Sequence, residues 1–255
     1  VIDADVIEGC RAIGFTLGVP APSMVGLVED VLADRAFVEQ RQRSAAELAN
    51  LEDLRGDSST VAPHYVANAL AAAALARAYG VGPMSVRDGL RAFRPDPHRI
   101  AEVGTVGGVL YVDDSKATNP HAAEAALASF ESIVWIAGGL LKGADVEPLV
   151  EKFAGRLKGV VVIGADRAQI SAALARHAPQ VPVLDLGAPD TGRVDAAGAE
   201  SVMDEIVAGA AGLAVPGDVV LLAPAAASMD MFTSYAARGQ AFEAAVRRLA
   251  EASGP

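Results

Sequence analysis

From residue 100 to the C-terminus, short runs rich in valine, isoleucine and leucine alternate with longer runs rich in alanine. The short runs have the length and β-branched content of buried strands, and the longer runs are long enough for helices. Strands that alternate with helices indicate a parallel sheet with helices on both faces. The pattern predicts strands at 100–106, 108–112, 133–137, 159–163, 181–186 and 219–222, and helices at 120–130, 146–157, 166–177, 197–214 and 229–252.

Two local signals agree with this order of elements. Gly107 and Gly108 lie between the first two strands, and a glycine pair is typical of a tight hairpin turn. Asn119 and Pro120 precede the first helix. Asparagine is a good N-cap, and proline suits the first helical turn because its missing N–H is not needed there. The predicted fold class is therefore α/β, with a doubly wound, Rossmann-like, mostly parallel sheet.

The first hundred residues are less regular. Partial alternation of apolar and polar residues predicts short strands at 14–18 and 25–37. An Ala-rich run at 66–79 predicts a helix, and a second helix is predicted at 85–93 with Ser85 as its N-cap.

Two closely spaced prolines, Pro95 and Pro97, then interrupt the pattern. They disfavour helix and favour a stiff linker. We therefore place a domain boundary here, with one domain at 1–96 and a second at 97–255.

Composition excludes several classes of protein. The net charge of −11 argues against nucleic acid as a partner, because phosphate binding needs a basic face. No run approaches the ~20 apolar residues of a transmembrane helix, so no membrane insertion is expected. Cys10 is the single cysteine, which excludes an internal disulfide and fits a reducing cytoplasm.

Three loops that follow predicted strands carry an unusual set of groups. In open α/β sheets, ligands bind at the carboxyl ends of the strands, and these loops share that edge. Lys142 supplies a positive charge, and Ser228 is expected to cap the last helix, whose first N–H groups would form an anion site. Each residue alone has an ordinary structural explanation, so the prediction rests on the convergence of the loops at 113–119, 138–145 and 223–230.

Three further patterns are missing from the sequence. There is no GxxxxGK[ST] phosphate-binding loop and no GxGxxG dinucleotide fingerprint after a strand. His98 and His121 lack metal-ligand spacing, so no metal site is expected in this chain. The residues by themselves therefore predict an α/β domain with an anion-binding edge, and no more.

Several motifs together resemble the D-glutamate-adding muramyl ligases. The block Asp113-Asp114-Ser115-Lys116-Ala117-Thr118-Asn119 is the most specific, because sister muramyl ligases differ there. The order and spacing of the motifs match across essentially all of residues 62–245. The other motifs are His98-Arg99, Gly138-Gly139 with Lys142, the run 223–232, Tyr235 with Arg238-Gly239, and the run 63–68.

The resemblance implies a parent with a UDP-binding domain, a P-loop ATPase domain and a Rossmann-like C-terminal domain. Residues 1–96 would be the end of the central ATPase domain, and 97–255 would be the C-terminal ligase domain that binds the incoming amino acid. The sequence opens at Val1 without a methionine. We therefore expect the latter part of a longer protein.

The implied reaction is ATP-driven amide formation in peptidoglycan biosynthesis. ATP phosphorylates the carboxylate of UDP-N-acetylmuramoyl-L-alanine, and the amine of D-glutamate then displaces phosphate. Mg²⁺ neutralises charge on the transferring group, with its ligands expected mostly outside this chain. The partners would be these small molecules, and the protein would be a cytoplasmic monomer.

The resemblance also implies roles for single residues. D-glutamate has two carboxylates, and its implied ligands are Thr118, Lys142, Ser228 and the amide of Met229, with Tyr235 packing beside them.

ATP would be bound by a second set of residues. Asn68 would face the adenine, and Arg99 and Asp114 would reach the ribose and phosphates. Lys116 would lie near the γ-phosphate or the acyl phosphate. Lys116 and Arg99 are therefore the expected catalytic residues.

Two alternatives stay open. The chain could come from another Mur-type or folylpolyglutamate-type amino acid ligase. It could also be a non-catalytic binding module, a truncated homologue that retains the amino-acid pocket. Since it lacks a P-loop, the chain alone is expected to be inactive as a ligase.

Overall fold

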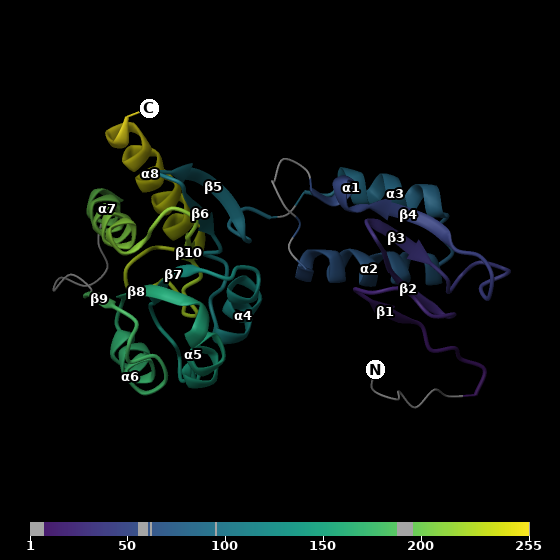
Figure 1. Ribbon diagram of the computed structural model, residues 1–255, viewed down its shortest axis with the longest axis horizontal. Coiled ribbons are helices and arrows are strands. Elements are labelled where there is room, and N and C mark those ends of the chain that lie inside the picture. Colours follow the sequence, from purple (N-terminus) through teal and green to yellow (C-terminus); the bar gives the residue numbers. More distant parts are fainter. Residues whose placement is uncertain (1–7, 56–60, 62, 95, 188–195, 255) are drawn as a thin grey trace. The chain divides into compact units, whose positions relative to one another are not determined.

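The computed structural model describes residues 8–55, 61, 63–94, 96–187 and 196–254. The chain divides into two compact units, residues 1–95 and 96–255 (Figure 1). Pro95, one of the two prolines behind the predicted domain boundary, lies outside the described residues. Within the described part of the chain, no helix combines the length and apolar character needed to cross a membrane.

The first unit contains a small mixed sheet packed against helices. Its strands lie in the order β1-β2-β3-β4, with β1 parallel to β2 and the other neighbours antiparallel. The core includes Leu32, Leu48 and Leu70, all fully buried. The elements are β1 (Gly14–Thr16), β2 (Met24–Val28), β3 (Val31–Asp34), β4 (Ala46–Asn50), α1 (Leu51–Arg55), α2 (Pro63–Ala78) and α3 (Pro83–Ala92).

Helix α3 begins two residues earlier than predicted. Its N-cap is Gly82, which offers no side-chain hydrogen bond, and Pro83 occupies the first turn. The prediction that Ser85 caps this helix is therefore wrong. Proline favours the first turn of a helix whichever residue is the N-cap, so Pro83 determines where α3 begins more strongly than Ser85 does.

The second unit contains a six-stranded sheet in the order β5-β6-β10-β7-β8-β9. β5 is antiparallel to β6 across the Gly107-Gly108 turn, and all other neighbours are parallel. The strands are β5 (Ala101–Val106), β6 (Val109–Asp113), β7 (Ile133–Gly138), β8 (Leu157–Ile163), β9 (Val183–Leu186) and β10 (Val219–Leu222). The helices are α4 (Pro120–Ala128), α5 (Glu147–Phe153), α6 (Arg167–His177), α7 (Ala196–Leu213) and α8 (Tyr235–Ser253), with a 3₁₀ turn, η1 (Ala154–Arg156), after α5.

Helices cover both faces of this sheet, with α4, α5 and α6 on one side and α7 and α8 on the other (Figure 1). Strand β7 shows the alternation that two covered faces require. Ile133 and Trp135 belong to the core under α4–α6, whereas Val134 and Ile136 belong to the core under α7 and α8. The predicted α/β class, with a doubly wound and mostly parallel sheet, is confirmed.

Strand β10 is last in the chain but lies between β6 and β7. Leu222 at its end pairs with Asp113 on one side and with Ile136 on the other. The chain winds outward from β6 through β9 and then returns to the centre, so the direction of winding changes at β10. Such a switch point is where open α/β sheets bind ligands.

The last helix begins later than predicted. α8 starts at Tyr235 and is capped by Ser234, whose side chain accepts a hydrogen bond from the amide of Ala237. Ser228 lies in a turn before the helix, where its carbonyl accepts hydrogen bonds from Met231 and Phe232. Ser228 is thus not a helix cap, and the anion site expected behind it is not formed by a helix N-terminus.

Strand β7 ends at a glycine that the packing requires. Gly138 has φ +125°, and a Cβ built there would lie 2.0 Å from the carbonyl oxygen of Ile163. Gly143, five residues later, also has a positive φ, +80°, but faces open space. The first glycine is needed for close approach of two strands, whereas the second is needed only for its backbone angle.

We therefore expect Gly138→Ala to lower the free energy of unfolding by more than about 3 kcal/mol, because backbone atoms must move. Gly143→Ala should cost about 1 kcal/mol, the strain of a positive φ alone. Urea unfolding followed by the fluorescence of Trp135, the single tryptophan and a fully buried residue of this unit, measures both changes. Equal losses would contradict this account of the end of β7.

Candidate functional site

The three loops singled out in the sequence lie at the same edge of the six-stranded sheet. We call residues 113–119, 138–145 and 223–235 the strand-end rim, in which the third loop is extended from the predicted 223–230 to Tyr235, where α8 begins. They follow β6, β7 and β10, which are neighbours in the sheet. Contacts between these loops, described next, hold the rim in one arrangement.

A buried arginine joins two of the loops. Arg238, on the first turn of α8, is 1% exposed. Its Nε and Nη2 donate hydrogen bonds to the hydroxyl and the carbonyl of Ser115, both at 2.9 Å. Its Nη1 donates to the carbonyl of Ala226 at 3.2 Å. The guanidinium therefore connects the loop after β6 with the loop after β10.

The charge of this arginine is retained despite its burial. Burial lowers the pKa of Arg238 to about 10, because removal from water disfavours the charged form, while Asp230 and Asp113 oppose the shift. At neutral pH the side chain is still a cation. Ser115, its main partner, is also fully buried and donates its hydroxyl proton to the carbonyl of Tyr235 at 2.7 Å.

Backbone contacts join the loops after β7 and β10. Leu140 and Ala227 exchange two hydrogen bonds between their amides and carbonyls, at 2.8 and 2.9 Å. Gly139 permits this contact, since a Cβ there would lie 2.2 Å from the carbonyl oxygen of Ala227. All three loops of the rim are therefore linked, two through Arg238 and two through this bridge.

Two predicted site residues meet at the rim. The Nζ of Lys116 donates a hydrogen bond to the hydroxyl of Tyr235 at 2.9 Å and lies 4.5 Å from the centre of its ring. Both side chains are half-buried. The hydrogen bond and the cation–π contact together orient the ammonium.

The other residues predicted to bind D-glutamate differ in exposure. Thr118 is half-buried and Ser228 is buried. Lys142 and Met229 are exposed, with Lys142 at a φ of +54° beside Gly143. The structure thus places all of these residues on the rim, with the Lys142 side chain open to solvent.

The residues predicted to bind ATP are divided between the two units. Asn68 is exposed on α2 of the first unit. In the second unit, Arg99 is exposed and pairs with Asp96 at 3.5 Å. Asp114, by contrast, is 6% exposed.

Asp114 is held between two elements. Its amide donates to the carbonyl of Leu222 at 2.8 Å, and its Oδ1 accepts from the amide of Ile100 at 3.3 Å. Burial raises the pKa of Asp114 to about 7, and the negative charge of Asp113 adds to the shift. The Ile100 hydrogen bond and Arg99 oppose it. This carboxyl therefore titrates near neutral pH.

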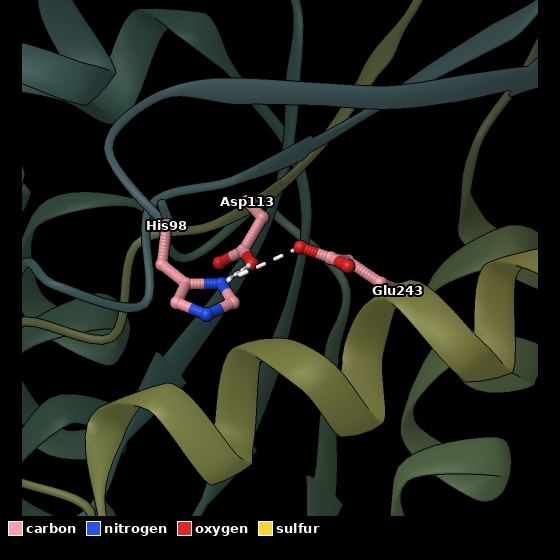
Figure 2. A group of neighbouring side chains, drawn as sticks. All are labelled: His98, Asp113 and Glu243. Atoms are coloured by element: carbon pink, nitrogen blue, oxygen red, sulfur yellow. Dashed lines mark hydrogen bonds and ion pairs between the residues drawn. The ribbon is translucent and has the colours of Figure 1, made fainter. Parts of the chain in front are cut away.

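A group that the sequence did not predict joins Asp113 of the rim to two residues outside it. His98, Asp113 and Glu243 place their polar atoms close together, with both carboxylates directed at Nδ1 of the imidazole (Figure 2). Nδ1 lies 2.5 Å from Oδ2 of Asp113 and 3.5 Å from Oε1 of Glu243. His121, the other histidine considered as a metal ligand, does not belong to this group, because it is exposed and faces Glu124.

This group does not fit Mg²⁺. The ion prefers six oxygen ligands, and two ligands at right angles on it lie about 3 Å apart. The imidazole nitrogen and the Asp113 oxygen are closer than that, at the distance of a strong hydrogen bond. We therefore interpret the group as a hydrogen-bonded network, and we assign no step of a reaction to a metal there.

Contacts between residues far apart in the chain could not be predicted from the sequence. Ser115 and Arg238 both belong to the motifs that carry the family resemblance. A single sequence, however, does not indicate that two residues 123 positions apart are in contact. Gly239 is a local indication that α8 packs closely against another element. A Cβ at this position would lie 2.2 Å from Nδ1 of His98, so the helix approaches the imidazole at a glycine.

Comparison with protein families identifies the second unit. The family model described as "Mur ligase, glutamate ligase domain" matches residues 98–226, about half of the chain. The chain belongs to the Mur ligase family. The matched region includes His98, the loop after β6 and the loop after β7, and it ends within the loop after β10.

Relatives in the Mur ligase family are closely similar over nearly the whole chain. A UDP-N-acetylmuramoylalanine–D-glutamate ligase of Streptomyces avermitilis is 64% identical over 246 residues, which are 96% of this chain and 50% of the relative. The protein of the same name from Mycolicibacterium smegmatis is 46% identical over 256 residues, covering 92% of this chain and 50% of the relative. The chain spans about half the length of the relatives that it matches.

Solved structures of other ligases share the fold at low identity. A UDP-N-acetylmuramate-alanine ligase from Thermotoga maritima gives a TM-score of 0.53 at 15% identity, covering 90% of this chain and 48% of the other. A pseudomurein peptide ligase from Methanothermus fervidus gives 0.56 at 14% identity, with coverages of 91% and 42%. At this identity the likeness concerns the fold alone.

The raised pKa of Asp114 predicts a pH-dependent stability. Its folded-state pKa of about 7 exceeds the ordinary value of 3.8, so the stabilising effect of the neutral carboxyl is complete below pH 4 and is lost as the pH rises towards 7. Asparagine resembles the neutral carboxyl and does not titrate. Asp114→Asn should therefore stabilise the fold more at pH 8 than at pH 5, by about 2 kcal/mol in Trp135-monitored unfolding. The control is Glu251→Gln, at an exposed position, whose effect on the free energy of unfolding should be equal at both pH values. An equal effect of Asp114→Asn at both pH values would contradict the raised pKa of Asp114.

The buried Arg238 predicts a large loss on substitution. Arg238→Met keeps much of the volume but leaves the carbonyls of Ser115 and Ala226 without these donors, at a cost of about 3–5 kcal/mol. Arg248→Met, on the same helix, removes a surface pair with Asp204 and should cost about 1 kcal/mol or less. The same unfolding measurement compares the two variants. A loss for Arg238→Met as small as that for Arg248→Met would show that Arg238 does not hold the rim.

Proposed function

We propose that the chain is part of an ATP-dependent Mur ligase that joins D-glutamate to UDP-N-acetylmuramoyl-L-alanine in peptidoglycan biosynthesis. The observation that carries the proposal is the 64% identity, over 96% of this chain, to a relative that bears the name of that activity. The strand-end rim supports it, because it gathers cationic and hydroxyl groups at the switch point of the sheet. ATP as a substrate places the reaction in the cytoplasm, and we expect the protein to act as a monomer.

In this proposal the loops after β6, β7 and β10 together bind D-glutamate. Its two carboxylates need several donors, and the candidates are Thr118, Lys142, Ser228 and the amide of Met229. Tyr235 packs beside them and holds Lys116 through its hydroxyl. Donors from different loops fix both carboxylates and so distinguish the two enantiomers.

ATP would be bound on the side of the rim nearest Arg99. Asp114 and Arg99 would contact the ribose and phosphates, and Lys116 would neutralise the transferring phosphoryl group. Asn68, on the first unit, would face the adenine. The exposed guanidinium of Arg99 suits a residue that engages the nucleotide only when the substrate is bound.

The chemistry is a transfer followed by a displacement. The γ-phosphoryl group moves to the carboxylate of UDP-N-acetylmuramoyl-L-alanine and ADP leaves. The amine of D-glutamate then attacks the acyl carbon, forms the amide bond and expels inorganic phosphate. Mg²⁺ would neutralise the phosphate charges, and its ligands are expected mostly in the half of the relatives that this chain does not span.

The deciding experiment is phosphate release by the full-length parent protein. With ATP, Mg²⁺ and UDP-N-acetylmuramoyl-L-alanine, release should depend on D-glutamate and not on L-glutamate. Release with another amino acid would favour a different Mur-type or folylpolyglutamate-type ligase. No release with any amino acid would favour a binding module. The 255-residue chain by itself should release none.

The pocket assignment makes a separate prediction for Lys142. Lys142→Ala in the full-length protein should raise the KM for D-glutamate by about tenfold or more, because a charge-assisted contact to a carboxylate is lost. The KM for ATP should change little. Lys158→Ala, at an exposed position on β8, is the matched control and should change neither value. An equal rise in the KM for D-glutamate and the KM for ATP would show that Lys142 is not part of the amino-acid pocket.

A further inference from the structure

The segment that carries Arg99 has a strained backbone. His98 and Ile100, on either side of it, have φ values of +62° and +47°. Both lie in the left-handed region, which is costly for a β-branched residue such as isoleucine. Such backbone persists only where the surrounding contacts over-determine it, and strain of this kind concentrates at functional sites.

Contacts from the start of the rim fix this segment. The carbonyl of His98 accepts a hydrogen bond from the amide of Lys116 at 3.1 Å. The amide of Ile100 donates to Oδ1 of Asp114 at 3.3 Å. The segment is thus bonded, on both sides of Arg99, to two residues that are themselves candidates for the nucleotide site.

Two carboxylates lie close to Nδ1 of His98 (Figure 2). Oδ2 of Asp113 lies at 2.5 Å from Nδ1, while Oδ1 of the same carboxylate accepts a hydrogen bond from the amide of Ser115 at 2.8 Å. One carboxylate therefore joins the His98 segment to the loop after β6. Glu243, on α8, also lies close to this nitrogen, with its Oε1 at 3.5 Å.

Helix α8 is adapted to this arrangement. At Gly239 a Cβ would lie 2.2 Å from Nδ1 of His98 and 2.7 Å from Oδ2 of Asp113. A side chain at this position would therefore displace the imidazole or the carboxylate. His98 is 5% exposed and Asp113 is fully buried, so both partners of this contact are enclosed by the protein.

We propose that Asp113 and Glu243 are positioning residues. They hold the imidazole of His98 so that the strained segment presents Arg99 next to Asp114, at one end of the strand-end rim. The role of Arg99 and Asp114 towards ATP rests on the proposed function, whereas the positioning of the segment does not. The two can therefore be tested separately.

The first test uses the 255-residue chain and amide hydrogen exchange followed by NMR. Asp113→Ala should speed the exchange of the Ile100 and Lys116 amides by about tenfold or more, because their contacts depend on the His98 segment. Amides of strand β8, which is separated from β10 by β7, should be unaffected. Glu243→Ala, at a half-buried position where a folding defect is not expected, should give a smaller change in the same direction.

The matched control is Glu251→Ala, an exposed carboxylate on the same helix. It should leave exchange at Ile100 and Lys116 as in the parent. If Asp113→Ala fails to fold, the comparison of Glu243→Ala with Glu251→Ala decides the question. Unchanged exchange at both amides in every folded variant would overturn the proposal.

The second test uses the same variants in the full-length protein. We expect Glu243→Ala to raise the KM for ATP by about fivefold while the KM for D-glutamate stays within twofold of the parent. Faster exchange together with an unchanged KM for ATP would support the positioning of the segment and remove Arg99 from the nucleotide site. That result would contradict the assignment of Arg99 to the nucleotide site in the proposed function, and not this inference.

Discussion

The buried guanidinium of Arg238 is the interaction on which the arrangement of the site depends. A charge that is removed from water is tolerated only where its donors are satisfied. Arg238 meets this condition by bonding the hydroxyl and carbonyl of Ser115 and the carbonyl of Ala226. Because these partners lie in different loops, satisfying one side chain brings the loops after β6 and β10 into a defined relation.

Close backbone approach supplies the rest of the frame. Gly139 lets the loop after β7 reach Ala227, and Gly239 lets α8 reach His98 and Asp113. The frame of the site, by which we mean these contacts and those of Arg238, is therefore built mainly from backbone atoms and buried side chains. Groups such as Lys142, Met229 and Arg99 extend from it into solvent. A rigid frame with exposed polar groups suits a site in which the substrates, and not the protein, supply the missing contacts.

Much of the second unit could be predicted from the sequence, because the signals are local. β-branched runs marked the buried strands, the Gly107-Gly108 turn marked the hairpin, and Asn119 caps α4 as expected, accepting a hydrogen bond from Ala122. The start of α8 was missed. Alanine, methionine and phenylalanine at 225–232 favour a helix. The chain instead makes a turn at Ser228, and α8 begins only after its N-cap, Ser234.

The site was predicted less completely than the fold. Loop positions and residue types follow from the order of the strands, and family resemblance supplied candidate roles for Lys116 and Lys142. Pairings such as Ser115 with Arg238, or His98 with Glu243, depend on the packing of α8 against the sheet. Such long-range contacts leave no periodic or spacing signal in one sequence.

The central claim is that the strand-end rim is a preformed site for D-glutamate. It is tested most directly by titrating the 255-residue chain with D-glutamate and with L-glutamate while recording the amide NMR shifts. We expect D-glutamate to shift amides in the loops at 114–119, 139–145 and 224–230, and L-glutamate to shift them much less. Equal shifts with both enantiomers, or shifts confined to residues outside these loops, would contradict it.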